Sequence, residues 1–113
     1  MAHITQPIMA LTNVPDMDTA RAIARRLVEN RVAACVNCLP QVNSIYRWQN
    51  TVEEASEITL LIKTTHRRYS EMEAMIKEMH PYELPEIVAL AIAEGLPAYL
   101  KWIEQETQTD ETI

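Results

Sequence analysis

The chain has 113 residues, enough for one domain with its own hydrophobic core and too few for two. Its formal net charge of -6 argues against a nucleic-acid-binding face or a partner membrane surface, both of which require clustered positive charge. A single glycine excludes the glycine-rich loops that bring backbone amides close to phosphate in nucleotide-binding enzymes.

The first third of the chain predicts a strand followed by a helix. Residues 8–14 are apolar and short enough for a buried strand, and Asp16 then supplies a helix cap. Apolar residues recur at three- and four-residue spacings from Ala20 to Val28, which predicts an amphipathic helix that ends near Asn30.

A long hairpin is predicted next. Residues 32–48 and 52–65 are rich in strand-forming residues, with Pro40 inside the first run and a turn at residues 49–51. A strand of about fifteen residues at roughly 3.3 Å each spans on the order of 50 Å. A compact chain of this size has a radius of gyration of only about 13 Å. The hairpin is therefore expected to extend beyond its own domain, where another subunit must cover its edges.

The remaining elements are a second helix, a strand and a short terminal helix. Thr65 is the expected cap of the helix, whose apolar stripe runs from Tyr69 to Met79. The methionines in this stripe are most simply interpreted as core residues. The alternative is a copper-binding methionine box. Residues 87–93 read as the fourth strand, and Pro97 stands where a first helical residue is expected.

The order strand, helix, strand, strand, helix, strand predicts an α+β fold of the ferredoxin-like βαββαβ type, with a short C-terminal helix and both main helices on one sheet face. The expected domain spans residues 1–106, followed by a flexible acidic tail at 107–113. Two cysteines three residues apart make a poor disulfide framework, and nothing marks export or a membrane span, so a cytoplasmic location is expected.

A stiff loop at residues 80–87 holds several polar side chains. Pro81 ends the second helix at His80, and Pro85 directs an extended chain into the fourth strand. The loop carries His80, Tyr82, Glu83 and Glu86. His80 is either a corner histidine or, with these neighbours, a ligand in a weak transition-metal site.

Three other features have both a structural and a functional interpretation. Cys35 and Cys38 lie three apart on a strand and point to opposite faces, so buried structural thiols are favoured over a chelating pair, although Cys35 remains a soft ligand candidate. Tyr46 and Trp48 share a strand face, and interface packing is favoured over ligand contact. Lys63 inside an apolar strand requires a partner, either a carboxylate such as Glu86 or an anionic ligand.

Several of these residues stand in an order that resembles a known family. The segments are Ala33-Ala34-Cys35-Val36-Asn37, Ser44-Ile45-Tyr46-Arg47-Trp48, Lys63-Thr64, His80-Pro81-Tyr82, Pro85-Glu86-Ile87 and Tyr99-Leu100-x-Trp102. Together they resemble the CutA divalent-cation tolerance family over roughly residues 8–103. The resemblance implies a homotrimer similar in plan to the PII signalling trimers, with long hairpins locking the subunits together and no assigned catalytic activity.

The resemblance also implies a site at the clefts between subunits. Its residues are Cys35, Tyr46, Trp48, Lys63, Tyr82 and Glu86, with His80 as the metal ligand. No cofactor is obligatory, and copper or another divalent metal is the optional ligand. The chain departs from copper-binding members at Thr12 and Met79, where those members carry a further cysteine and histidine, and at Asn50, where glycine is common at the hairpin tip.

The resulting prediction is a non-catalytic, cytoplasmic homotrimer of the metal-ion response, which binds copper or a small ligand weakly at its clefts. The alternative is a PII-like signalling or scaffold trimer whose cleft binds a non-metal ligand. An acylphosphatase-like enzyme is disfavoured because residues 13–18 hold two aspartates and no arginine or glycine to bind phosphate. An RNA-binding module is disfavoured by the acidic charge and the lack of stacking aromatics on the third strand.

Overall fold

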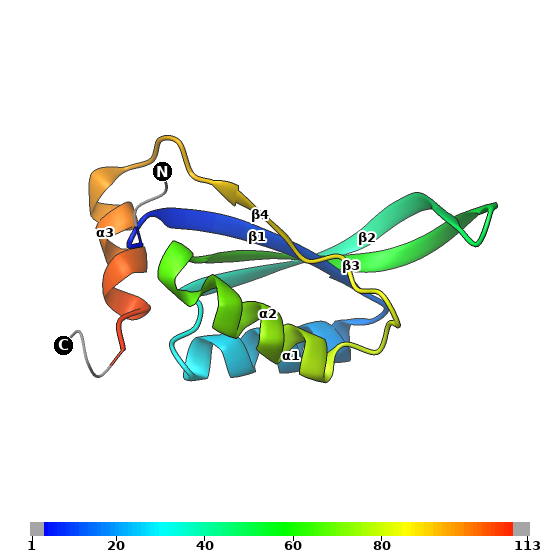
Figure 1. Cartoon of the computed structure of the whole chain (residues 1–113), viewed down its shortest axis with the longest axis horizontal. Helices are drawn as coiled ribbons and strands as arrows, with labels where there is room; N and C mark the ends of the chain where they lie inside the picture. The colour runs from blue at the N-terminus through cyan, green and yellow to red at the C-terminus, as the bar shows by residue number, and fades with distance from the viewer. Residues whose placement is uncertain (1–3, 110–113) are drawn as a thin grey trace.

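The computed structural model describes residues 4–109. It consists of one antiparallel sheet with helices packed against it (Figure 1). The elements are β1 (Pro7–Val14), α1 (Met17–Glu29), β2 (Cys35–Trp48), β3 (Thr51–Thr65), a 3-10 turn (His66–Arg68), α2 (Tyr69–Met79), β4 (Val88–Ala91) and α3 (Pro97–Glu106). The strand order is β2-β3-β1-β4, with every neighbouring pair antiparallel. The predicted α+β ferredoxin-like fold is confirmed.

The core lies between one face of the sheet and the helices α1 and α2, which both cover that face in Figure 1. Side chains of β1 alternate between buried and half-buried along the whole strand, as a strand with one covered face requires. The predicted helical stripes are confirmed, since Ile23 and Leu27 of α1 and Met72 and Ile76 of α2 are fully buried. The methionine stripe of α2 therefore belongs to the core.

Local signals set most helix ends. The Asp16 side chain accepts a hydrogen bond of 2.8 Å from the Thr19 amide, which begins α1 and holds the pKa of Asp16 below its ordinary value. His80 leaves the helical region with φ -78° and ψ 132°, so α2 ends before Pro81 as predicted. Pro97 occupies the first turn of α3.

The prediction that Thr65 caps the second helix is wrong. Thr65 precedes the 3-10 turn instead, its side chain makes no capping hydrogen bond, and α2 begins four residues later at Tyr69. The fourth strand is also shorter than the predicted 87–93, because its ladder with β1 covers Val88–Ala91 and continues only as one hydrogen bond from the Ile92 amide to the Pro7 carbonyl.

The β2–β3 hairpin extends beyond the body of the molecule, as predicted (Figure 1). Ile58–Thr65 of β3 pairs with β1, whereas residues 51–57 pair only with β2. We call residues 42–57, which form this projecting end, the arm. A bulge between Leu39 and Val42 marks its base, and Pro40 lies within the bulge because it cannot donate a ladder hydrogen bond.

The packed chain continues past the expected domain boundary at residue 106. Thr107 is buried, and its hydroxyl donates a hydrogen bond of 2.8 Å to the Ile103 carbonyl. Arg31 donates to the Gln105 carbonyl at 2.9 Å, which ties the end of α3 to the loop after α1. Residues 110–113 of the predicted tail lie outside the described residues. No helix among the described residues has the length and apolarity to cross a membrane.

Candidate functional site

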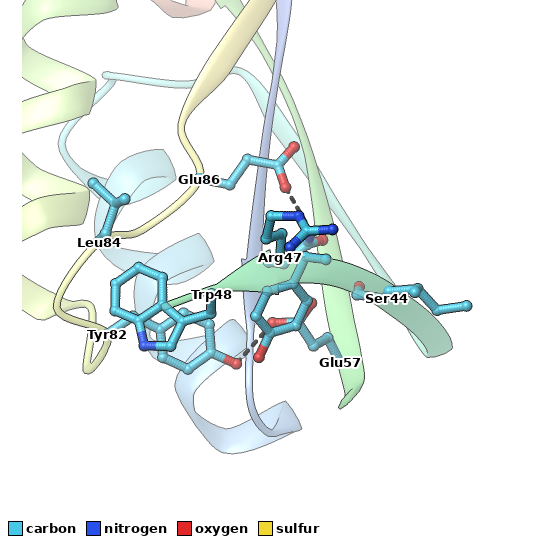
Figure 2. Close-up of a pocket in the computed structure, with 10 residues that line it drawn as sticks. Ser44, Arg47, Trp48, Glu57, Tyr82, Leu84 and Glu86 are labelled. Atoms are coloured by element: carbon cyan, nitrogen blue, oxygen red, sulfur yellow. Dashed lines mark hydrogen bonds between the residues drawn. The ribbon is translucent and has the colours of Figure 1, made fainter. Parts of the chain in front are cut away.

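A cleft of about 450 Å³ opens where the arm leaves the body, and we call it the arm cleft (Figure 2). The end of β1, both strands of the arm and the loop between α2 and β4 form its walls. Its lining residues are Asn13, Ser44, Ile45, Tyr46, Arg47, Trp48, Glu57, Tyr82, Leu84 and Glu86. An adjoining hollow of about 410 Å³ shares Tyr46, Trp48, Tyr82 and Leu84 with it and adds Pro81 and Glu83.

His80 is buried beside the cleft and fixes the corner between α2 and the loop. Its Nδ1 accepts a hydrogen bond of 3.2 Å from the Tyr82 amide, and its Nε2 lies 2.7 Å from the Asn13 carbonyl oxygen. Because Nδ1 accepts, Nε2 carries the proton and donates. Both ring nitrogens are thus engaged in holding the loop against β1, and the His80 ring also packs against that of Tyr82 with centroids 4.7 Å apart.

Tyr82 and Glu57 join the loop to the arm. The Tyr82 hydroxyl donates a hydrogen bond of 2.7 Å to Glu57 Oε2, and the two side chains face each other in Figure 2. Burial, and then the Glu57 carboxylate, raise the pKa of the Tyr82 hydroxyl far above its ordinary value. Glu57 is itself only 7% exposed. Its partner is a neutral hydroxyl, and no salt bridge within residues 4–109 reaches it.

Asn13 at the end of β1 orients a second carboxylate. Its Nδ2 donates a hydrogen bond of 3.0 Å to Glu86 Oε1, and its Oδ1 accepts one of 2.6 Å from the Thr59 hydroxyl. Because a carboxylate only accepts hydrogen bonds, the amide nitrogen of Asn13 faces Glu86 and its oxygen faces the Thr59 hydroxyl. Glu86 is thereby held over the cleft, as Figure 2 shows.

Lys63 and Cys35 lie elsewhere on the sheet. The Lys63 ammonium donates to Asn37 Oδ1 and lies 4.0 Å from Cys35 Sγ. Lys63 pairs with Met9 in the sheet, four residues along β1 from Asn13. Since Glu86 is bonded to Asn13, the predicted pairing of Lys63 with Glu86 is not observed. Within one chain, the candidate residues form two separate groups.

The second group borders a cavity under α3. This cavity, of about 380 Å³, is lined by Met9, Lys63, Leu90, Tyr99, Leu100 and Ile103 among others. Burial and the adjacent Cys35 thiol raise the pKa of Tyr99. Lys63 and Glu94 are the charged residues of an otherwise largely apolar lining.

The two cysteines point to opposite faces of the sheet, as predicted. Cys38 packs against the helix-covered core, and burial raises the pKa of its thiol. Cys35 lies on the other face beside Lys63. Both thiols are free and half-buried rather than fully buried. Among the described residues, no three His, Cys, Asp or Glu side chains come together to hold a metal ion.

Glu57, Asn13 and Arg47 are cleft residues that sequence reasoning missed. A signal for Glu57 was present: it stands at alternate positions with Thr59, Leu61 and Lys63, and so shares their sheet face. Glu57 is buried because the loop after α2 folds back and places Tyr82 over it. The sequence pattern of the strand does not indicate this contact.

The chain matches the family model described as CutA1 divalent ion tolerance protein over residues 8–106. It is 50% identical over 99 residues to the divalent-cation tolerance protein CutA of Thermus thermophilus, covering 88% of this chain and 96% of that protein. It is 41% identical to protein CutA of Mus musculus over 88% of this chain, and spans only 56% of the mouse protein.

Solved structures agree with the sequence comparisons. The divalent cation tolerance protein of Thermus thermophilus superimposes with a TM-score of 0.88 at 48% identity, over 90% of this chain and 99% of that one. A CutA structure from Archaeoglobus fulgidus, described as periplasmic, superimposes with a TM-score of 0.87 at 33% identity, over 90% and 99% of the two chains. The names of the Thermus and Archaeoglobus relatives specify tolerance to divalent cations, whereas the mouse relative is named only protein CutA.

Proposed function

Because the chain belongs to the CutA1 divalent ion tolerance family, we propose that it acts in divalent-cation tolerance as a non-catalytic homotrimer. In this proposal, clefts between the subunits bind copper or another divalent cation weakly. The two free cysteines favour a reducing compartment, and we place the protein in the cytoplasm.

The observation that carries the metal proposal is the pair of carboxylates in the arm cleft, Glu57 and Glu86, neither of which has a salt bridge in the described chain. Carboxylate oxygen and imidazole nitrogen are ligands that divalent cations accept. His80 can coordinate a metal only by giving up one of its two hydrogen bonds. The lost hydrogen bond reduces the net free energy of metal binding, so the binding is weak.

A neighbouring subunit is needed to complete such a site. The described chain brings fewer than three suitable ligands together at one place. Two groups of candidate residues, one around Tyr82 and one around Cys35 and Lys63, lie apart on the same chain. In the proposed trimer, the arm of one subunit lies against the sheet of the next, so that both groups border a shared cleft.

Calorimetric titration of the metal-free protein with copper and zinc tests this function. We expect saturable binding of about one ion per subunit, lost in His80→Ala and weakened in Glu86→Gln and Cys35→Ser. His66→Ala is the matched control, because His66 is exposed on the 3-10 turn. Sedimentation of each variant verifies that the assembly is intact. Binding that is absent, or indifferent to His80 and Glu86, contradicts a metal site in the cleft.

A second candidate function is a PII-like signalling or scaffold trimer whose cleft binds a non-metal ligand. Two observations favour it. Both nitrogens of His80 are already hydrogen-bonded, and three aromatic side chains line the cleft, namely Tyr46, Trp48 and Tyr82. Aromatic surfaces suit an organic ligand better than a bare ion. The same titration separates the two candidates.

A further inference from the structure

Glu57 is a buried carboxylate without a countercharge. It is 7% exposed, and in residues 4–109 its hydrogen-bond partner is the neutral Tyr82 hydroxyl. Arg47 lines the same cleft but is exposed and forms no salt bridge with Glu57 or Glu86. Removing a carboxylate from water without pairing it is costly, so a side chain in this position calls for a cation.

The surroundings of Glu57 determine which kind of cation fits. Tyr46, Trp48 and Tyr82 contribute aromatic side chains to the arm cleft, and Leu84 adds an apolar contact. Trp48 and Tyr82 line the same cleft, and in Figure 2 the Tyr82 hydroxyl points toward Glu57. Aromatic faces attract diffuse positive charge such as that of ammonium or guanidinium groups. A compact metal ion instead requires several converging donors, and the described chain holds no group of three.

We propose that the arm cleft binds a small organic cation, an alkylammonium or guanidinium compound. Its charge faces Glu57 and Glu86, and its carbon atoms contact Tyr46, Trp48 and Tyr82. The volume of about 450 Å³ is in the range of small-molecule sites. This inference rests on the non-metal form of the proposed function and names its ligand class.

The hydrogen bonds around the cleft support this assignment. Asn13 holds Glu86 through its amide nitrogen, and Tyr82 holds Glu57 through its hydroxyl, so each carboxylate is oriented by a neutral donor. Neutral donors fix the carboxylates without cancelling their charge. The negative potential of both groups therefore remains available to a ligand.

The test uses choline and its uncharged isostere 3,3-dimethyl-1-butanol, which have the same shape and differ in the positive charge. The full-length protein is titrated in the presence of a metal chelator, followed by calorimetry and by tryptophan fluorescence, with Trp102→Phe leaving Trp48 as the single tryptophan. We expect choline to bind saturably, with about one molecule per subunit, and the neutral isostere to bind at least tenfold more weakly. Propylguanidinium is titrated in parallel, since preference for it over choline indicates an arginine side chain of a partner protein as the source.

Two variants locate the site. Glu57→Gln keeps an acceptor for the Tyr82 hydroxyl while removing the charge, and we expect it to weaken choline binding at least tenfold. Glu54→Gln removes the same charge from an exposed position of the arm outside the cleft and leaves binding unchanged. Equal binding of choline and its isostere, or equal effects of the two variants, overturns the inference.

The outcome is separable from that of the metal proposal. If copper or zinc binds through His80 and Glu86 while no organic cation binds, the organic-cation inference fails and the metal function stands. If neither binds and Glu57→Gln weakens subunit assembly, the countercharge of Glu57 comes from a neighbouring subunit, and the inference also fails.

Discussion

Thr12 is a polar residue whose buried environment offers its hydroxyl no hydrogen-bond partner among the described residues. It is fully buried on the helix-covered face of β1. An unpaired buried hydroxyl retains its desolvation cost without any compensating bond. We expect Thr12→Val, which preserves the shape of the side chain, to raise the free energy of unfolding by about 1 kcal/mol in urea denaturation.

Thr64 provides the matched control for this prediction. It is equally buried on the adjacent strand β3, but its hydroxyl donates a hydrogen bond of 2.6 Å to the Val32 carbonyl. Thr64→Val leaves that carbonyl without its donor, so we expect a loss of about 1–3 kcal/mol. Equal effects of the two substitutions would show that the hydroxyl of Thr12 is satisfied in solution.

The position of Thr12 also bears on the metal hypothesis. Its side chain lies on the helix-covered face of the sheet, whereas its neighbour Asn13 points into the arm cleft. Met79, the other position noted as a departure from the family pattern, packs partly against the same core. Both departures therefore affect packing under the helices more directly than the lining of the cleft.

Some residues of the arm cleft were predictable from the sequence and others were not. Tyr46, Trp48, Tyr82 and Glu86 were predicted to lie at clefts between subunits, and that remains a prediction; within the single chain, all four line the arm cleft. The stiff corner at His80 was predictable because proline restricts the residue before it. The burial of Glu57 was not, because it depends on a hydrogen bond between side chains that are 25 residues apart.

At the scale of elements, the tip of the arm is the most informative turn. Trp48 pairs with Thr51, so the turn has two central residues, Gln49 and Asn50, rather than the predicted 49–51. Both have left-handed backbones, with φ 48° and 68°. Two successive positive φ values are typical of the type I′ hairpin turn, which fits the twist of the flanking strands.

This turn gives a test of backbone strain. Glycine adopts positive φ at no steric cost, so we expect Asn50→Gly to raise the free energy of unfolding by about 0.5 kcal/mol. Asn50→Ala should lower it by about 1 kcal/mol, since a Cβ without a polar group is disfavoured there. Thermal denaturation of both variants, with hydrogen exchange of the arm amides, measures the effect. A stabilising Asn50→Ala would contradict the left-handed turn.

The elements also show why sequence reasoning succeeded at some ends and failed at others. The Asp16 cap depends on a hydrogen bond to a residue three positions along, and the stop at Pro81 depends on the restriction that proline imposes on the preceding residue, so the local sequence contains both signals. Thr65 looked like a comparable cap, but the chain there continues into a 3-10 turn. Its backbone is held by Gln6 and Ile4, whose carbonyls accept from the amides of His66 and Arg67. Such distant partners leave no local pattern.

For the whole molecule, the exposed apolar surface is distributed in a way that one chain does not explain. All four residues of β4 are exposed, and Val88 and Leu90 present large side chains on the sheet face opposite α1 and α2. On the arm, Ile45 is 70% exposed and Val52 is 62% exposed. Isolated apolar residues on a surface are ordinary, but an extended arm with open edges and apolar side chains favours association.

The assembly prediction follows from the arm. Ile45 pairs with Glu54 and Arg47 with Val52, so Ile45 and Val52 lie on the same face of the arm. We expect sedimentation at micromolar concentration to give three times the 13.0 kDa mass of the chain. Ile45→Lys places a charge in the proposed contact and should shift the protein toward monomers, since a desolvated unpaired charge is costly.

Val28→Lys supplies the control, because Val28 is an exposed apolar residue of α1, away from the arm. It introduces the same charge and should leave the trimer unchanged. A monomeric wild-type protein, or equal dissociation by both variants, would contradict assembly through the arms. Dissociation specific to Ile45→Lys would support assembly through the arms. Val52 lies on the same face of the arm but does not line the arm cleft, so loss of ligand binding together with the trimer in Val52→Lys would show that a neighbouring subunit closes the cleft.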